Sequence, residues 1–437
     1  MTLTRAPVAA DVVQRRTLRV LAGGQLLGGL GLAAGVAVGA LLGRDLGGLD
    51  ALAGVPSALA TGGGALAALP LSRLMARAGR RPGLLVGYAT GATGALVVVM
   101  AAQVRSFALL LLGMVAFGVG NTASLLARYA AADLATPQAR GRAVSTVLFA
   151  TTFGAVAGPN LVEPTGAIAR TVGLPTLAGP FLLSVLAYAA AAVVVGLRLR
   201  PDPLLLARER ETDHAGDGVE APLAAPAAAQ PPLAGRTTPP ATPSSSAWPL
   251  LLRAPALPAL AAMVGAQFVM VAMMTMTPVH MRAHDHGLGL VGFVISAHIA
   301  GMYALSPLSG WLVDRFGAMA TLSGGAGTLI AAGLLGALAP GDSVVLLTLA
   351  LFLLGLGWSL SLVGGSTRLT EALPLPLRAR GQGNADLLVG LAGATGGLGS
   401  GLVLALSGFA ALGLLTVAVA AALLAAAQRA RSMAGVG

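Results

Sequence analysis

Twelve long apolar runs divide the chain, and none shows the alternation of apolar and polar residues expected of a membrane-barrel strand. Each run is long enough to cross the hydrocarbon core of a bilayer as a helix, which takes about 20 residues. We therefore predict an all-α membrane protein with twelve transmembrane helices. The predicted spans are 18–42, 51–71, 83–104, 107–130, 143–162, 174–197, 255–280, 288–312, 318–338, 343–366, 383–407 and 409–427.

The amino-acid composition excludes a soluble protein of this size. Of the 437 residues, 56% are hydrophobic and only 10% are charged, whereas soluble domains carry about 25% charged residues. The chain has no cysteine, which excludes disulfides, thiolate metal sites and cysteine nucleophiles. It also has no phosphate-binding loop, no ATPase motif and no Ser/His/Asp arrangement. We therefore expect no enzymatic activity and no prosthetic group.

The positive charge of the chain comes from arginine alone, because it contains no lysine. A net charge of +11 can indicate nucleic-acid binding, but these arginines lie between the apolar runs, so no nucleic-acid partner is expected. The two termini and the even-numbered loops hold 23 arginines, and the odd-numbered loops hold only 4. The positive-inside rule then predicts a multi-pass protein of the inner or plasma cell membrane with both termini in the cytoplasm.

Residues 201–250 differ abruptly from the rest, because acidic residues are followed there by runs of alanine, proline, threonine and serine. Such a composition cannot bury a core and is typical of a flexible linker. We therefore predict an N-terminal six-helix half (1–200), a cytoplasmic linker (201–250) and a C-terminal six-helix half (251–437). The halves also repeat, since Arg140-Gly141 matches Arg380-Gly381, 240 residues later. A parallel repeat places a substrate site between pseudo-symmetric halves, near the bilayer midplane.

Histidine and methionine concentrate in the seventh and eighth spans, where four of the five histidines and seven of the thirteen methionines fall within 40 residues. Met270 and Met274 are four residues apart, as are His298 and Met302, so each pair shares a helix face. At 1.5 Å per residue, Met270 and His298 both come out roughly 15 Å below the outer surface. If the two faces oppose each other, the four side chains form a ladder of thioether and imidazole donors.

This donor set suits copper. Soft thioether ligands select Cu(I), imidazole also binds copper, and no carboxylate is present to favour Mg, Ca or Mn. Nearer the outside, His280, His284 and His286 are expected to form an outer collecting site. Two other interpretations stay open on spacing alone. Methionine commonly fills helix interfaces and drug pockets, and an intramembrane histidine can relay protons.

The loop after the eighth span carries a spaced motif, G-x-x-x-D-R-x-G, formed by Gly310, Asp314, Arg315 and Gly317. The loop after the second span has Ala76 in place of the aspartate, and its remaining motif residues are Arg77, Gly79, Arg80 and Arg81. These loops resemble the signature of the major facilitator superfamily of secondary transporters, and the resemblance covers the chain outside the linker. Without an aspartate at position 76, we expect Asp386, low in the eleventh span, to pair with Arg77.

The fifth span carries Gly154-Ala-Val-Ala-Gly158-Pro159, which is similar to the antiporter motif of that superfamily but lacks its trailing glycines. Small residues four apart also let two helices approach closely without any role in transport. The motif therefore leaves the direction of transport open.

Within the superfamily, the chain resembles the CcoA-like copper importers, which carry M-x-x-x-M in the seventh span and H-x-x-x-M in the eighth. The resemblance implies that the copper ligands are Met270, Met274, His298 and Met302. The expected function is copper import by alternating access through a monomer, with copper as the transported ion. The alternative is a proton-coupled exporter of lipophilic drugs or other small organic molecules. A non-transporting receptor or scaffold is disfavoured by the intact repeat and the intramembrane histidine.

Overall fold

The described part of the chain contains only helices. The computed structural model describes residues 5–48, 55–217, 247–253 and 256–434. Its first helices are α1 (Arg5–Gly47), α2 (Val55–Ala78), α3 (Arg80–Gln103), α4 (Phe107–Ala132), η2 (Pro137–Ala139), α5 (Arg140–Asn160), α6 (Val162–Thr171), η3 (Thr176–Ala178), α7 (Gly179–Arg198) and α8 (Pro203–Asp217). The remaining helices are α9 (Trp248–Leu251), α10 (Leu257–Ala283), α11 (Leu288–Ile299), the π-helical turn η4 (Ala300–Ala304), α12 (Ser306–Phe316), α13 (Ala318–Leu338), α14 (Val344–Ala372) and α15 (Leu375–Ala434).

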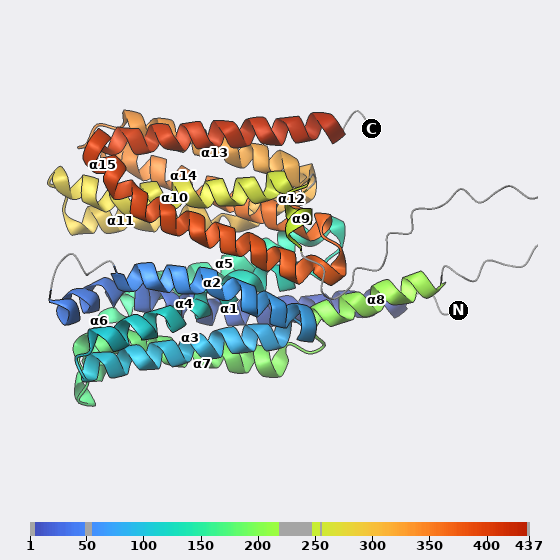
Figure 1. Ribbon diagram of the computed structural model, residues 1–437, viewed down its shortest axis with the longest axis horizontal. Helices are drawn as coiled ribbons and strands as arrows, with labels where there is room; N and C mark the ends of the chain where they lie inside the picture. Colours follow the sequence, from blue (N-terminus) through green and yellow to red (C-terminus); the bar gives the residue numbers. More distant parts are fainter. Residues whose placement is uncertain (1–4, 49–54, 218–246, 254–255, 435–437) are drawn as a thin grey trace, which may run out of the picture.

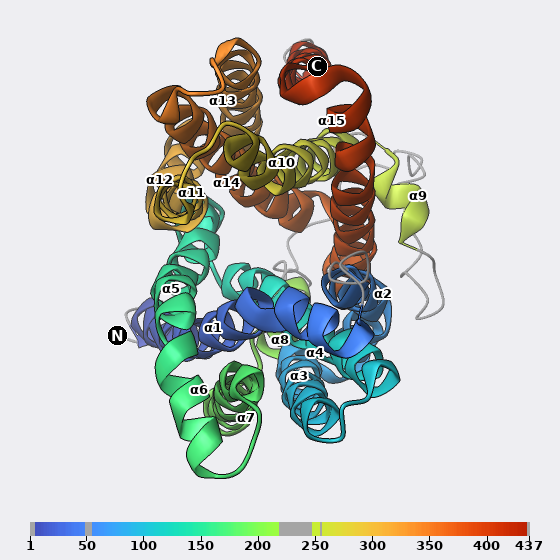
Figure 2. The same ribbon diagram turned by 90° about the vertical axis from the view of Figure 1, so that its left-hand side faces the viewer.

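These helices form two bundles that lie against each other, one from α1–α7 and one from α10–α15 (Figures 1 and 2). Among the described residues, nine helices are long and apolar enough to cross a membrane, and α5 with α6 makes a tenth as a bent pair. Helix α15 is interrupted at Gly408, whose φ of 76° and ψ of 178° are not helical, so it makes two passes. Helix α1 is 43 residues long. The predicted all-α membrane fold is confirmed, and the count of twelve spans stays a prediction.

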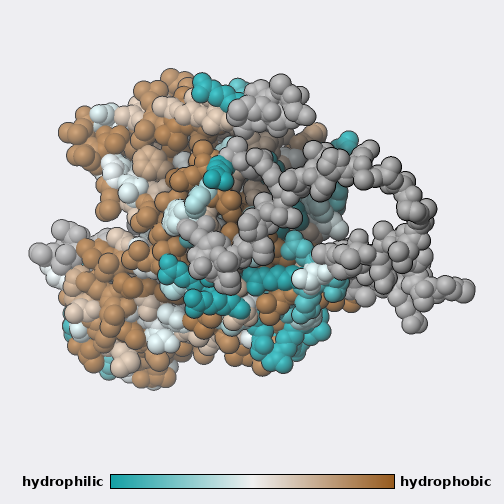
Figure 3. All heavy atoms as spheres, turned by 45° about the vertical axis from the view of Figure 1, so that its right-hand side comes forward, coloured by the Kyte–Doolittle hydropathy of each residue, from teal (hydrophilic) through white to brown (hydrophobic). Residues whose placement is uncertain are grey.

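The outward-facing side chains of the bundles are apolar, as expected where hydrocarbon replaces water. Leu186 on α7 and Val345 on α14 are 69% and 77% exposed. Hydrophobic residues cover much of the surface in Figure 3, and hydrophilic residues gather toward the end at which α8 lies. Inside, each half has its own apolar core, one around Leu84 and Phe117 and the other around Leu354 and Val363.

The predicted linker begins with a helix that its composition did not reveal. Asp202 caps α8 by accepting from the backbone N–H of Leu204 at 3.0 Å, and it also accepts from the backbone N–H of Arg81 at 2.7 Å. Arg208 of α8 donates to the carbonyl of Ala76 at 3.0 Å. These bonds attach α8 to the junction of α2 and α3. Within the predicted linker, residues 218–246 lie outside the described residues.

The two halves touch where small residues let helices approach. Between α12 and α5, a Cβ on Gly310 would lie 2.1 Å from Oγ of Ser145 and 2.6 Å from the carbonyl oxygen of Gly141. Between α15 and α2, a Cβ on Gly383 would lie 2.1 Å from Cβ of Ser72. Ser72 and Gly310 occupy the first position of the loop motif in the two halves. That position therefore serves close packing between the halves.

Gly310→Val is expected to separate α12 from α5, because its side chain would overlap Ser145 and the Gly141 carbonyl. Overpacking of this kind costs about 1–3 kcal/mol of stability. The chain has no native cysteine, so a single Ser306→Cys substitution can report the separation. Ser306 is buried at this contact and donates to the Ser145 carbonyl. A hydrophilic maleimide should therefore label the purified Gly310→Val protein faster than the Ser306→Cys parent.

Gly327→Val is the matched control, because a Cβ at Gly327 meets nothing within 4 Å. It should leave the labelling rate of Ser306→Cys at the parent level. Equal labelling in the two valine backgrounds would contradict the close contact between α12 and α5.

Candidate functional site

A cavity of about 180 Å³ lies between the two halves. Helices α1, α2 and α4 line it from one side, and α10, η4, α14 and α15 line it from the other. A water molecule needs about 10–15 Å³ of cavity volume, so this space exceeds what a single bare ion requires. Its uncharged polar lining residues are Thr61, Asn121, Thr122, Gln267, Tyr303 and Trp358.

The C-terminal wall of the cavity is aromatic and held in place by a side-chain hydrogen bond. The indole Nε1 of Trp358 donates to Oε1 of Gln267 at 2.7 Å. The ring of Tyr303 meets Trp358 edge-on, with centroids 5.8 Å apart and planes 80° apart. This bond and this packing fix both rings at the cavity. The wall therefore offers aromatic surface and an amide to a bound molecule.

Arg128 of α4 and Asp386 of α15 form a buried ion pair at this cavity, and it joins the two halves. Nη2 of Arg128 lies 2.5 Å from Oδ1 of Asp386, and the side chains are 1% and 5% exposed. Arg128 also donates to Oγ of Ser366 at 2.9 Å, to the hydroxyl of Tyr129 at 2.9 Å and to the carbonyl of Leu125. Oδ2 of Asp386 has no hydrogen bond with any described residue. The cation is thus more firmly held than the anion.

The expected pairing of Asp386 with Arg77 is wrong. Arg77 is exposed at the end of α2, and Arg128 engages the carboxylate instead. Sequence reasoning missed the pair, although both residues lie inside predicted spans, where ionisable groups are rare and usually functional. The approach of α4 to α15, which puts the two charges together, is a tertiary contact between the halves.

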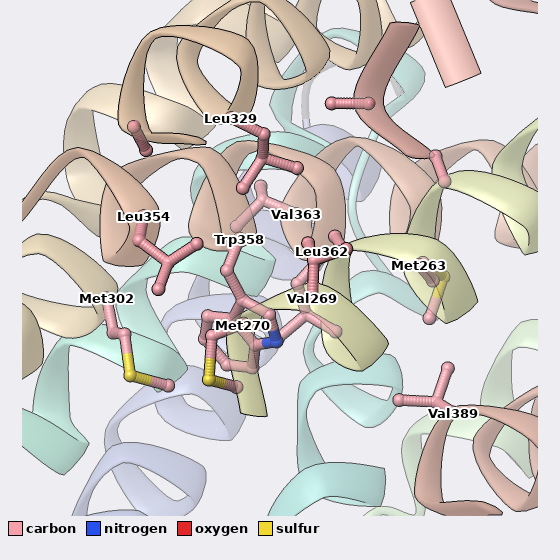
Figure 4. Close-up of a cluster of buried hydrophobic side chains, with 14 of the residues drawn as sticks. Met263, Val269, Met270, Met302, Leu329, Leu354, Trp358, Leu362, Val363 and Val389 are labelled. Carbon is pink, nitrogen blue, oxygen red and sulfur yellow. The ribbon is translucent and has the colours of Figure 1, made fainter. Parts of the chain in front are cut away.

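Two of the four predicted copper ligands meet at the cavity. Met270 on α10 and Met302 on η4 both line it and are 4% and 7% exposed. Figure 4 shows the two side chains with their sulfur atoms turned toward the same side of the cluster. The cavity is therefore lined by two thioethers together with aromatic and amide groups.

The other two predicted ligands do not line this cavity. Met274 is half-buried and packs against the apolar core of the C-terminal half. His298 is fully buried, and its Nδ1 donates to the carbonyl of Leu351 on α14 at 2.8 Å. In the neutral ring this bond leaves Nε2 without a proton, and Nε2 has no partner among the described residues.

A change of helix type separates His298 from Met302. The chain passes from α-helix to the π-helical turn η4 at Ala300, where the N–H of Leu305 bonds five residues back to the Ala300 carbonyl at 3.3 Å. A π turn does not place residues four apart on opposite faces, so His298 and Met302 stay on adjacent turns of one helical segment. His298 is buried through its bond to α14, whereas Met302 lines the cavity.

The predicted outer histidines lie together at one end of α10. The ring of His280 stacks on Phe409 with centroids 4.3 Å apart, and it lies 4.5 Å from the ring of His284. Nδ1 of His284 bonds to the His280 carbonyl at 2.9 Å, and Nε2 of His286 bonds to the Gly341 carbonyl at 3.0 Å. Within the described ranges, no three His, Asp or Glu side chains are arranged to hold a metal ion. The outer collecting site stays a prediction.

The motif of the second half contacts the first half through its aspartate. Asp314 accepts from the backbone N–H groups of Gly141 and Arg142 at 2.8 and 3.1 Å, and from Nε of Arg142 at 2.8 Å. These residues form the first turn of α5, so the carboxylate lies at the positive end of that helix. Arg315 is exposed, and Gly317, with φ 83°, ends α12.

The degraded motif of the first half makes a different contact. Arg80 is fully buried and donates through Nε to Oδ2 of Asp133 on α4 at 2.8 Å. Its Nη2 donates to Oε1 of Gln382 on α15 at 2.6 Å, and Gln382 donates to Oγ1 of Thr370 at 3.1 Å. At this motif an arginine and an amide join the halves. At the motif of the second half, an aspartate and the N-terminal end of a helix join them.

The remaining predicted motif residues make contacts within the N-terminal half. Gly79, with φ 94°, turns the chain between α2 and α3, and Arg81 donates to a backbone carbonyl of α7 at 2.6 Å. A Cβ on Gly154 would lie 2.3 Å from a backbone nitrogen of α1, so Gly154 serves close packing of α5 on α1. Gly158 and Pro159 belong to the same helix, and Gly158 is buried.

Comparison with known proteins identifies similar chains. Residues 21–397 match the family model described as Major Facilitator Superfamily. The chain is 44% identical over 413 residues to the uncharacterized MFS-type transporter YdeG of Bacillus subtilis, covering 94% of this chain and 90% of that protein. It is 28% identical over 378 residues to the riboflavin transporter RfnT of Brucella anthropi, covering 86% and 85%. The solved structure of the human organic anion transporter MFSD10 aligns with a TM-score of 0.71 at 19% identity, covering 95% and 99%.

The Arg128–Asp386 pair predicts a strongly non-additive mutant cycle. Arg128→Met or Asp386→Leu alone leaves a buried charge unpaired, which is expected to lower the free energy of unfolding by about 3–5 kcal/mol. The double variant should recover most of that loss, because apolar side chains of similar size replace both charges. Denaturant unfolding of the purified protein in detergent measures all three.

The exposed pair of Arg105 and Asp45 supplies the control. Its atoms are 3.4 Å apart, and its side chains are 66% and 48% exposed. The same cycle at this pair should show a coupling of about 0–1 kcal/mol, as is usual for surface ion pairs. Additive losses at Arg128 and Asp386 would show that the two charges do not depend on each other.

Proposed function

The chain belongs to the Major Facilitator Superfamily, and from this premise we propose that it carries a small organic molecule across the membrane through the cavity between its halves. As a member of that superfamily it is a multi-pass secondary transporter and not an enzyme. The observation that carries the proposal is the chemistry of the cavity wall, where the aromatic rings Tyr303 and Trp358 lie beside the amides Asn121 and Gln267. Aromatic surface with a few placed polar groups is typical of sites for small organic molecules.

Contacts at one end of the molecule support alternating access. The Asp314 contact with α5 and the Arg80–Gln382 bond both involve residues at the ends of helices, on the side where the arginine-rich loops lie. These bonds hold the halves together on the predicted cytoplasmic side. Breaking them while forming contacts at the opposite end would expose the cavity to the other side of the membrane.

The similarity to RfnT also favours an organic substrate. That protein is named as a riboflavin transporter, and the match covers 86% of the present chain. Riboflavin contains an aromatic ring system and several hydrogen-bonding groups, which suit the rings and amides of the cavity. Riboflavin is therefore a reasonable first probe, beside smaller aromatic compounds.

Thr61→Trp is expected to block ligand binding, because Thr61 lines the cavity and a large ring there would fill it. The probes are riboflavin, 1-naphthamide and 1-naphthoate, each measured by the rise in unfolding temperature of the purified protein. At least one probe should stabilise the wild type, and Thr61→Trp should weaken its binding by about tenfold or more, or about 1.4 kcal/mol.

Thr93→Trp is the matched control. Thr61 and Thr93 are both exposed, and each hydroxyl bonds only to the backbone carbonyl four residues earlier, at 3.0 Å. Thr93 lies on α3, outside the cavity lining, so its substitution should leave probe binding unchanged. The proposal fails if no probe stabilises the wild type, or if both tryptophan variants bind as the wild type does.

Copper is the second candidate, favoured by the two thioethers at the cavity. Met270 and Met302 line the same space, and thioether sulfur prefers Cu(I) to harder ions. Met274 and His298 lie outside that lining, so a copper ion here would have two of the four predicted donors. This smaller donor set places copper behind an organic substrate.

Met270→Leu and Met302→Leu separate sulfur chemistry from shape, because leucine keeps the volume and lacks the sulfur. If copper is the substrate, both variants should lose most radioactive copper uptake into cells or proteoliposomes. Met100→Leu is the control, since Met100 is 52% exposed on α3 and lies outside the cavity lining. Copper uptake that is absent from the wild type, or equal in all four proteins, removes this candidate.

A further inference from the structure

We infer that the transported molecule carries an anionic group, and that Arg128 binds this group when a proton neutralises Asp386. The inference rests on the proposed function, because it takes the central cavity as the substrate site. It adds a chemical class for the substrate and a coupling ion.

The cavity contains one charge of each sign. Among its described lining residues, Arg128 and Asp386 are the only charged side chains. The remainder of the lining is aromatic, aliphatic, thioether, hydroxyl or amide, so no other charged side chain there can compensate a charge brought in by a ligand. A charged ligand must therefore replace one member of the pair.

Arg128 is the member that stays in place. Three acceptors besides Asp386 hold its guanidinium, namely the Ser366 hydroxyl, the Tyr129 hydroxyl and the Leu125 carbonyl. The guanidinium carbon also lies 4.2 Å from the centroid of the Tyr129 ring. An arginine keeps its charge at any physiological pH. A fixed cation with one exchangeable partner is a receptor for an anion.

Asp386 is the member that can be neutralised. Its Oδ1 is bonded to Arg128 and to the Tyr129 hydroxyl, while Oδ2 has no partner among the described residues. A proton can therefore bind at Oδ2 without displacing an existing hydrogen bond. The resulting carboxylic acid is neutral, so the positive charge of Arg128 is no longer compensated. An anionic group of the ligand can then pair with Arg128.

The surroundings of the pair leave Asp386 as the proton site. The titratable groups that face it are Arg128 and Tyr129 from α4, with Tyr303 of η4 also at the cavity. The lining residues contributed by α2, α10 and α14 include no titratable side chain. Asp133 of α4 is instead paired with Arg80, away from the lining.

The charges balance in a cycle of one proton and one anion. Asp386 gains a proton and becomes neutral, and the anionic group of the substrate pairs with Arg128, so the net charge of the cavity stays at zero. Proton and anion therefore bind cooperatively and are released together when the carboxylate pairs with Arg128 again. Because Arg128 and Asp386 belong to different halves, this exchange also changes a contact between the halves.

The test measures the binding affinity of the purified protein for 1-naphthoate and for its neutral amide, 1-naphthamide, between about pH 5 and pH 8. The carboxylate of 1-naphthoate is ionised over this whole range. Wild-type affinity for the carboxylate should rise as the pH falls, by at most about tenfold per pH unit because one proton is linked. Affinity for the amide should not change with pH. Asp386→Asn, which mimics the protonated acid, should bind the carboxylate at every pH as tightly as the wild type does at the lowest pH.

A direct readout of the proton accompanies these affinities. Adding 1-naphthoate to the wild type should produce the C=O band of a protonated carboxylic acid in the infrared difference spectrum, and this band should be missing in Asp386→Asn. Arg128→Gln should lose the preference for the carboxylate over the amide. If that variant does not fold, the Asp386→Asn data decide alone.

Several results would overturn the inference. The first is that the wild type binds 1-naphthoate and 1-naphthamide with equal affinity at low pH. The second is that the affinity of Asp386→Asn for 1-naphthoate still changes with pH. The third is that 1-naphthoate produces no carboxylic acid band in the infrared difference spectrum of the wild type. If one of these results is found while the amide still binds and Thr61→Trp blocks that binding, the proposed function stands and the anion assignment falls. If neither compound binds and riboflavin does not bind, both fall together.

Discussion

An unpaired charge in a low-dielectric protein interior costs several kcal/mol, and this constraint governs how the two halves meet. Among the described residues, two arginines are fully buried, and each has an acceptor from the other half. Arg128 bonds to Asp386 and Ser366, and Arg80 bonds to Gln382. The halves are therefore joined by bonds that must be exchanged, rather than simply broken, when their relative position changes.

The loop motifs of the two halves both contact the opposite half, but they do so through different polar groups. Each motif begins with a small residue, Ser72 or Gly310, that lets a helix of the other half approach closely. The second half then adds Asp314 at the positive end of α5, whereas the first half has Ala76 and relies on Arg80 with Gln382. Pseudo-symmetry of the backbone thus coexists with asymmetric polar contacts.

The candidate site could be predicted only in part. The repeat placed a site between the halves, and the cavity lies there with Met270 and Met302 in its lining. His298 is instead buried through its bond to the Leu351 carbonyl on α14, and nothing in the spacing of His298 and Met302 indicates this contact. The Trp358–Gln267 bond joins residues 91 positions apart, so no local pattern reveals it. Local spacing places residues on a helix face, but it does not determine which neighbouring helix each side chain meets.

The sequence by itself predicted an all-α membrane protein, because apolar runs of fixed length are a local property. It did not reveal α8 at the start of the predicted linker. It placed Asp386 within the eleventh predicted span but paired it with Arg77. Only the tertiary structure decided that Asp386 meets Arg128 and not Arg77. The physical reason is that pairing depends on which helices of the two halves lie side by side. Contacts between halves, such as α4 with α15, arise from packing over the whole molecule.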